Sequence, residues 1–244
     1  MKTLLVILFA LMAISPPKDT RYFELRIYYA APGKLDALIS RFSNNTTRIF
    51  EKHGMQNIGY WLPTTNDKNA LYYILAYPDK EARKKSWDAF GADPEWKDVK
   101  TKSEVNGKLV DSVKSVFMYA TDILPAINGG SNGPDRTFEL RTYHCLPGRL
   151  PNLVTRFKDH TTKLFEKNGM QNIAYFTSDE PEGKQSDLVY MLAFKDQDAA
   201  TRSWTAFRAD PQWIAAKDAS EKDGKIVEKV ESVFLKPLPF SKIK

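Results

Sequence analysis

Two matching sets of polar residues are the strongest candidates for chemistry in this 244-residue chain. Each set places a carboxylate, a guanidinium and a phenol at alternate positions of a predicted strand, and the six residues are Glu24, Arg26, Tyr28, Glu139, Arg141 and Tyr143. Alternate strand residues point to the same face of a sheet. Such a face has two interpretations. In the first, the residues pair with one another in an ion-pair network, because a buried charge needs a partner. In the second, they form a ligand-binding pocket in which Arg26 and Arg141 hold an anionic group.

Other chemically active residue types are few. The three histidines, His53, His144 and His160, lack the spacing of metal ligands and none recurs in a second copy, so no metal site is predicted. Phosphate-binding glycine patterns and the nucleophile-elbow pattern are absent from the sequence, so no cofactor and no catalytic residue are predicted. The one cysteine, Cys145, is expected to be a buried, unreactive thiol.

The polar sets recur because the chain contains an internal repeat. The stretch from Phe23 to Leu62 returns 115 positions later without a gap, starting at Phe138. A loop that is two residues longer in the second copy, Ser178 to Asp187, changes the offset to 117, and surface loops tolerate such insertions. The repeat predicts a signal peptide and leader (1–21), a first domain (22–121), a linker (122–136), a second domain (137–237) and a C-terminal tail (238–244).

Each copy has the same order of predicted elements. In the first copy, β-rich runs predict strands at 22–30, 55–62, 71–77 and 110–119. Periodic apolar residues predict helices from Leu35 and over 79–90, and Asp93 followed by Pro94 predicts a further short helix. The order is β-α-β-β-α-β, which is the ferredoxin-like unit.

A ferredoxin-like unit covers one face of its sheet with helices and leaves the other face bare. Two units in one chain can pack their bare faces together around a barrel-like interior, because the tether supplies an effective concentration on the order of millimolar. On the first strand, the alternation predicts that Phe23, Leu25 and Ile27 face the helices and that the polar set faces the interior. By the same alternation, His144 is expected on the helix side.

The charges and the N-terminus restrict the partners and the location. The formal net charge is +6, but basic and acidic residues are interleaved, so a solvated surface is predicted rather than a nucleic-acid site. A basic start and an apolar stretch from Leu4 to Ile14 are typical of a signal peptide and too short to span a membrane. Export to the periplasm or out of the cell is therefore expected, with no stable membrane anchor after signal removal.

Several ordered motifs resemble the NIPSNAP family. In the first copy they are Phe23-Glu24-Leu25-Arg26-x-Tyr28, Pro32-Gly33-Lys34-Leu35, Phe50-Glu51-Lys52-His53-Gly54, Gly59-Tyr60-Trp61 and Ala89-Phe90-x-x-Asp93-Pro94-x-Trp96. The second copy repeats most of them, but Asn168 replaces His53 and Phe176 replaces Trp61. The resemblance implies an α+β fold class in which two ferredoxin-like βαββαβ units form an intramolecular dimeric α/β-barrel.

The resemblance implies little chemistry. Barrels of this superfamily include monooxygenases, isomerases, haem proteins and plain binders, and a fold does not fix a function. The first hypothesis is an exported tandem NIPSNAP-like protein that binds a small molecule or a protein. The alternative is a small-molecule enzyme of the monooxygenase or isomerase kind that uses the inter-domain cavity, lined by the six polar residues. A third is a structural partner that assembles through sheet edges. A small molecule in the interior and a second copy of the chain are the partners that these hypotheses allow.

Overall fold

The structure is a computed structural model that describes residues 19–124, 126–127 and 135–244. The signal peptide expected within 1–21 therefore lies almost wholly outside the described residues, as does the centre of the linker expected at 122–136. Among the described residues, no helix is long and apolar enough to cross a membrane.

The two copies fold into the same series of elements. The first unit consists of β1 (Tyr22–Ala30), α1 (Leu35–Arg41), η1 (Phe42–Thr46), α2 (Thr47–Lys52), β2 (Gln56–Pro63), β3 (Ala70–Tyr77), α3 (Lys80–Ala92), α4 (Pro94–Ser103) and β4 (Val110–Ala120). The second consists of β5 (Thr137–Cys145), α5 (Leu150–Arg156), η2 (Phe157–Thr161), α6 (Thr162–Lys167), β6 (Gln171–Ser178), β7 (Leu188–Phe194), α7 (Gln197–Ala209), α8 (Pro211–Ser220) and β8 (Val227–Pro237). Both are the predicted ferredoxin-like unit.

Local chemistry sets the helix boundaries. Asp93 and Asp210 cap α4 and α8, because each carboxylate accepts a hydrogen bond from the N–H two residues later, at 2.8 and 2.9 Å. The first helix of each unit widens into a π-helical turn, η1 or η2, which the sequence did not predict. There the hydroxyls of Thr46 and Thr161 donate to the carbonyl five residues earlier, at 3.1 Å.

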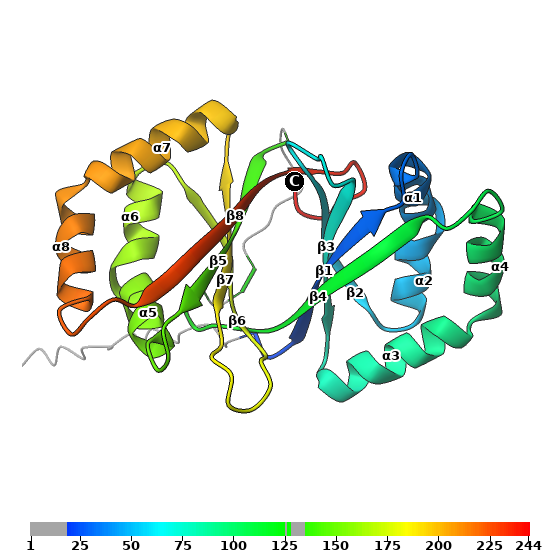
Figure 1. Ribbon diagram of the computed structural model, residues 1–244, viewed down its shortest axis with the longest axis horizontal. Helices are drawn as coiled ribbons and strands as arrows, with labels where there is room; N and C mark the ends of the chain where they lie inside the picture. The colour runs from blue at the N-terminus through cyan, green and yellow to red at the C-terminus, as the bar shows by residue number, and fades with distance from the viewer. Residues whose placement is uncertain (1–18, 125, 128–134) are drawn as a thin grey trace, which may run out of the picture.

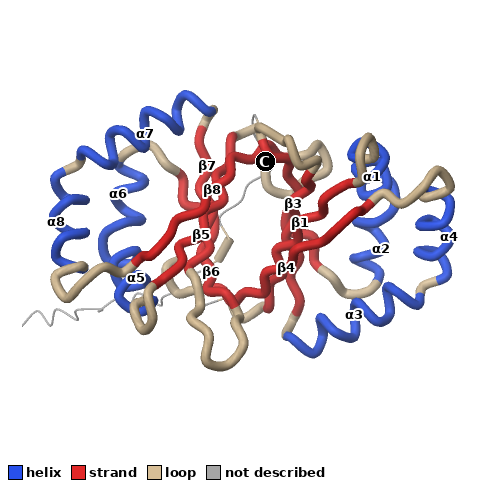
Figure 2. Tube along the Cα trace, in the orientation of Figure 1, coloured by secondary structure: helices blue, strands red, loops and turns tan. Residues whose placement is uncertain are grey.

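The strands close into one antiparallel barrel in the order β1-β3-β2-β8-β5-β7-β6-β4. Each unit contributes four strands, and the units join where β2 pairs with β8 and where β4 pairs with β6. Figure 1 shows the two sheets facing each other in the centre, and Figure 2 shows the helices on the two outer sides. The predicted intramolecular barrel is confirmed.

The faces of the first strand are the reverse of the prediction. Phe23 and Leu25 lie in a core cluster shared by both units, with Phe138, Leu140 and other residues of the second unit. The ring of Phe23 packs at a tilt against Phe176 of the second unit, with ring centroids 4.9 Å apart. The apolar set therefore fills the barrel interior. Alternation along a strand separates two faces but does not say which one the helices cover.

The C-terminal segment after β8 is part of the packed fold. The Leu238 N–H donates to the Tyr60 carbonyl at 2.9 Å, and the Tyr60 N–H donates to the Ser241 hydroxyl at 3.0 Å. Ile243 is buried in the shared core cluster. The segment predicted as a tail thus extends the contact between the second unit and β2 of the first.

A candidate site in the cavity between the two units

A cavity of about 600 Å³ opens between the two units. Residues of the first unit form one side of it, namely Tyr22, Lys80, Arg83, Lys114, Ser115, Val116 and Phe117. Residues of the second unit form the other side, namely Thr142, His144, Ser178, Asp179, Glu180, Pro181, Asp187, Val189 and Glu231. Its volume is within the range of about 300–1,000 Å³ that is usual for small-molecule sites.

The barrel opens here because β4 and β6 separate. These strands pair only from Met118 to Ala120 and from Phe176 to Ser178, so the preceding part of β4 pairs with β1 alone. The cavity occupies the place where β6 would continue the sheet. Residues from both faces of β4 therefore line it, with Val116 on the barrel side and Phe117 on the helix side.

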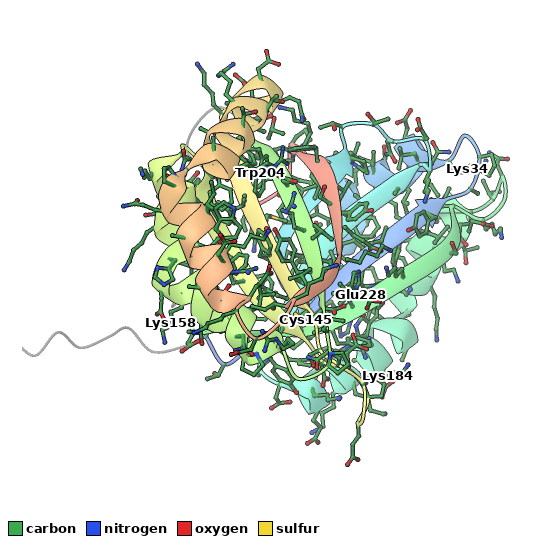
Figure 3. The ribbon with its side chains drawn as sticks, turned by 60° about the vertical axis from the view of Figure 1, so that its left-hand side comes forward. Lys34, Cys145, Lys158, Lys184, Trp204 and Glu228 are labelled. Atoms are coloured by element: carbon green, nitrogen blue, oxygen red, sulfur yellow. The ribbon has the colours of Figure 1, made fainter. Side chains whose placement is uncertain are left out.

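The long loop between β6 and β7 forms the outer wall of the cavity. This is the loop with the two-residue insertion, and its tip carries Lys184 (Figure 3). Asp179 joins it to the first unit, because its carboxylate accepts hydrogen bonds from the Tyr22 hydroxyl at 2.7 Å and from Lys80 Nζ at 2.8 Å. Both contacts hold the pKa of Asp179 below its ordinary value, the lysine more strongly than the tyrosine.

A histidine–carboxylate pair lines the cavity. His144 Nδ1 is 2.7 Å from Asp187 Oδ2, and His144 Nε2 is 3.5 Å from Glu231 Oε1. Nε2 is buried and has no hydrogen-bond partner among the described residues. Burial raises the pKa of Asp187, and the charge of His144 opposes that shift. The Asp187 carboxylate fixes the orientation of the His144 imidazole, as the carboxylate partner of a catalytic histidine does in many enzymes.

Lys114 brings a positive charge to the same cavity. Its ammonium group makes no hydrogen bond within the described part of the chain, and its charge, with those of Lys229 and His144, helps to lower the pKa of Glu231. The hydrogen bond from Lys229 is the largest cause of that shift. The cavity therefore combines an imidazole, carboxylates and an available ammonium with the apolar side chains of Val116 and Val189.

The six predicted site residues line neither this cavity nor the barrel interior, which corrects the expectation from the sequence. In the first unit, the Glu24 carboxylate is fully buried on the helix side and accepts hydrogen bonds from Arg83 Nε at 2.9 Å and Trp87 Nε1 at 3.0 Å. Arg26 donates to Glu24 at 2.6 Å and to the Tyr73 hydroxyl at 2.9 Å. Burial disfavours the Glu24 carboxylate, but Arg83 and Arg26 outweigh burial and lower its pKa.

The corresponding network of the second unit has fewer donors. Glu139 accepts from Arg141 and from Trp204 Nε1, the latter at 2.6 Å, and Trp204 lies between α7 and the sheet (Figure 3). Ala200 occupies the position of Arg83, so the second arginine is missing. Tyr28 and Tyr143 pack edge-on against aromatic rings of their own units, at 5.7 Å from Phe42 and 5.9 Å from Phe157. The ion-pair interpretation accounts for both sets, and Arg26 and Arg141 lie in separate cores.

Sequence reasoning placed His144 on the wrong face and did not single out Asp187. Because the two strand faces are the reverse of those predicted, the polar set lies under the helices and His144 lies on the barrel side. Two signals in the sequence could have identified the site. His144 and Asp187 occur only in the second copy, and Asp187 ends the one loop that differs in length between the copies.

The first unit carries different residues at the equivalent positions. Thr142, His144 and Val189 correspond to Ile27, Tyr29 and Tyr72, which are bulkier or lack a basic nitrogen. Asp187 corresponds to Ala70, and Glu231 corresponds to Lys114. The cavity chemistry is thus present once per chain. No group of three His, Cys, Asp or Glu residues in the described part of the chain is arranged to hold a metal ion.

Fold and repeat together define a class of protein, the dimeric α/β-barrels, with both halves supplied by one chain. The structure is similar to a proposed monooxygenase from Fusobacterium nucleatum subsp. nucleatum ATCC 25586, with a TM-score of 0.58, 13% identity and coverage of 90% of this chain and 93% of that chain. It is also similar to a proposed monooxygenase from Lactobacillus acidophilus NCFM, with a TM-score of 0.55, 13% identity and coverage of 89% and 93%. An anthrone oxidase-like protein matches with a TM-score of 0.56, 16% identity and coverage of 92% and 94%.

The chain belongs to the NIPSNAP family, whose profile matches residues 23–125 and 138–242. The two matched segments coincide with the two structural units, so the chain is a tandem NIPSNAP protein. No curated protein matches it in sequence. The similarities to solved structures lie below 25% identity and describe the fold alone.

Proposed function

We propose that this protein binds a small organic molecule in the cavity between its two units. One observation carries the proposal: a cavity of about 600 Å³ in which apolar walls and several polar groups converge. Sites for small molecules typically combine an apolar lining with a few fixed polar groups. Val116 and Val189 supply the apolar lining, and His144, Asp187 and Lys114 supply groups that orient a ligand.

Differences between the two copies support a binding role. Thr142 and Val189 leave space that Ile27 and Tyr72 would occupy at the equivalent positions of the first unit. The barrel contains both pairs of residues, so its folding does not require the smaller pair, Thr142 and Val189. The inserted loop then closes the outer side through Asp179.

The double substitution Thr142→Ile and Val189→Tyr tests the proposal, because it introduces the residues that the first unit already carries. Native mass spectrometry of the purified protein and ligand-observed NMR against a library of aromatic and carbonyl fragments measure binding. We expect the wild type to bind fragments and the double variant to lose that binding while it keeps its melting temperature within a few degrees. The variant Val105→Tyr makes the same exchange as Val189→Tyr at an exposed residue that does not line the cavity, and it is expected to bind like the wild type. Equal binding by the double variant and the wild type would contradict the proposal.

We also propose that the protein is exported. The basic start and the apolar stretch from Leu4 to Ile14 support this proposal. N-terminal sequencing of the protein purified from its native host tests it. A mature chain that begins after the apolar stretch is expected, and a mature chain that keeps Met1 would overturn the proposal.

A further inference from the structure

The orientation of His144 leaves its second ring nitrogen available as a base. A carboxylate can only accept a hydrogen bond, so at 2.7 Å from Asp187 Oδ2 the Nδ1 atom carries the proton. In the neutral imidazole, the lone pair then lies on Nε2. Asp187 is thereby a positioning residue that selects the tautomer.

Nothing in the described structure uses Nε2. The atom is buried and has no hydrogen-bond partner, although leaving such an atom unsatisfied costs about 1–3 kcal/mol. The nearest charged group is Glu231 Oε1, at 3.5 Å. The Glu231 side chain is 45% exposed, so it can turn into solvent and leave Nε2 facing a molecule in the cavity.

The pair has no role in building the barrel. At the equivalent positions the first unit has Tyr29 and Ala70, which pair in the β1–β3 ladder, so the barrel forms there without a histidine and a carboxylate. A structural ion pair would be expected in both copies, as the Glu24 and Glu139 networks are. The His144–Asp187 pair instead occurs only where the cavity is.

We propose that His144 is a general base that removes a proton from a carbon acid bound in the cavity, the substrate class being a small, mainly apolar molecule with an enolisable carbonyl group. This inference rests on the binding function proposed above. His144 Nε2 takes the proton from the carbon next to the carbonyl. The C–H electron pair forms the new C=C bond, and the carbonyl oxygen becomes an enolate oxygen. When the substrate also has a C=C bond next to that carbon, the enolate is conjugated. His144 then returns the proton to the far carbon of the dienolate, the C=C bond moves into conjugation with the carbonyl group, and the net reaction is an isomerisation without an oxidant.

The charges around His144 are suited to that step. Lys114 lines the same cavity and makes no hydrogen bond within the described residues, so its ammonium group is available to the enolate oxygen. Asp187 stabilises the imidazolium that forms when Nε2 accepts the proton. The apolar side chains of Val116 and Val189 exclude water from one side of the site, which strengthens these interactions.

5-Nitrobenzisoxazole is the probe, because a single base-catalysed step converts it into a coloured phenolate. The base removes the ring C–H proton, the electron pair forms the nitrile, and the N–O bond breaks to give the phenolate. We expect His144→Gln to lower the rate by about 100-fold, the lower end of typical general-base contributions. Asp187→Asn is expected to lower the rate and to change its pH profile, because the tautomer is no longer fixed. His160→Gln is the matched control, since His160 is exposed on η2, and is expected to keep the wild-type rate.

The cavity-filling pair Thr142→Ile and Val189→Tyr separates the two proposals. Loss of both probe binding and turnover in that variant, with loss of turnover alone in His144→Gln, supports both. Turnover by His144→Gln as fast as that of the wild type overturns the base proposal, whatever the binding result. Probe binding that is unchanged in the cavity-filling variant overturns the cavity proposal. ¹⁵N NMR of the histidine rings gives a readout independent of activity, and a neutral tautomer of His144 with its proton on Nε2 also overturns the role of Asp187.

Discussion

The hydroxyl of Tyr22 donates a hydrogen bond to the Asp179 carboxylate at 2.7 Å, although the two residues lie 157 positions apart and belong to different units. Lys80 Nζ reaches the same carboxylate at 2.8 Å. The Asp179 N–H in turn donates to the Phe117 carbonyl at 2.7 Å. Three contacts thus attach the inserted loop of the second unit to the first unit, directly beside the cavity.

We predict that Asp179→Asn lowers the free energy of unfolding at neutral pH by about 1–2 kcal/mol, because both hydrogen bonds to a charged acceptor are weakened. The Asp179 pKa is lowered from 3.8 in the folded protein, so its contribution is fully present above that pH and is lost as the pH falls through the folded pKa. The stability difference between variant and wild type should therefore shrink below about pH 4. Urea unfolding at a series of pH values measures this, with Glu180→Gln as the control in the same loop. A difference that stays constant down to pH 2 would contradict the assignment.

Glu24 and Glu139 differ in how many arginines neutralise them. Glu24 is paired with Arg26 and Arg83, whereas Glu139 is paired, among the residues that the structure describes, with Arg141 alone. We predict that Glu24→Gln costs about 3–5 kcal/mol, since Glu24 is fully buried and its loss leaves two partly buried guanidinium groups without a counter-charge. Glu139→Gln is expected to cost less. Thermal and urea unfolding of the two variants, side by side, measure the difference, and an equal or larger loss for Glu139→Gln would refute this explanation.

Gly59 leaves room for the indole ring of Trp61. A Cβ atom at Gly59 would lie 2.3 Å from the Trp61 ring, closer than any van der Waals contact. The equivalent pair in the second unit is Ala174 and Phe176. We predict that Gly59→Ala destabilises the protein by about 1–3 kcal/mol through overpacking.

The double variant Gly59→Ala with Trp61→Phe reproduces the pair of the second unit. It is expected to recover part of the stability lost in Gly59→Ala, because the smaller ring makes room for the methyl group. A double-mutant cycle measured by thermal unfolding gives the coupling energy of the two positions. Strictly additive effects would show that the ring is not what requires glycine.

Cys145 is predicted to react slowly with thiol reagents. Its side chain is buried, and burial raises its pKa from 9.0 to about 11, which lowers the thiolate fraction at neutral pH about 100-fold. The reaction with an aromatic disulfide reagent should therefore be at least that much slower in the native protein than in urea. Rapid modification of the native protein would show that the strand end at β5 opens readily.

Much of the fold follows from the sequence because its determinants are local. The repeat predicted the number of units, the alternation of apolar and polar residues predicted the strands, and Asp93 with Pro94 predicted the start of α4. Closure of the barrel also followed, because a sheet with helices on one face must bury the other. The π-helical turns did not follow, because no pattern in the sequence marks the threonine whose hydroxyl donates to the carbonyl five residues earlier.

The candidate site depended on tertiary structure. The sequence by itself determined that Glu24, Arg26 and Tyr28 share one face of a strand and that Phe23 and Leu25 share the other. Only the packed structure decided which face meets the helices. On α3, Arg83 neutralises Glu24 and Trp87 donates a hydrogen bond to it, whereas the ring of Phe23 packs against Phe176 of the other unit. The same packing places His144 next to Asp187 on the barrel side of the sheet. The physical reason is that alternation is a property of one strand, whereas the environment of each face is made by segments far away in the chain.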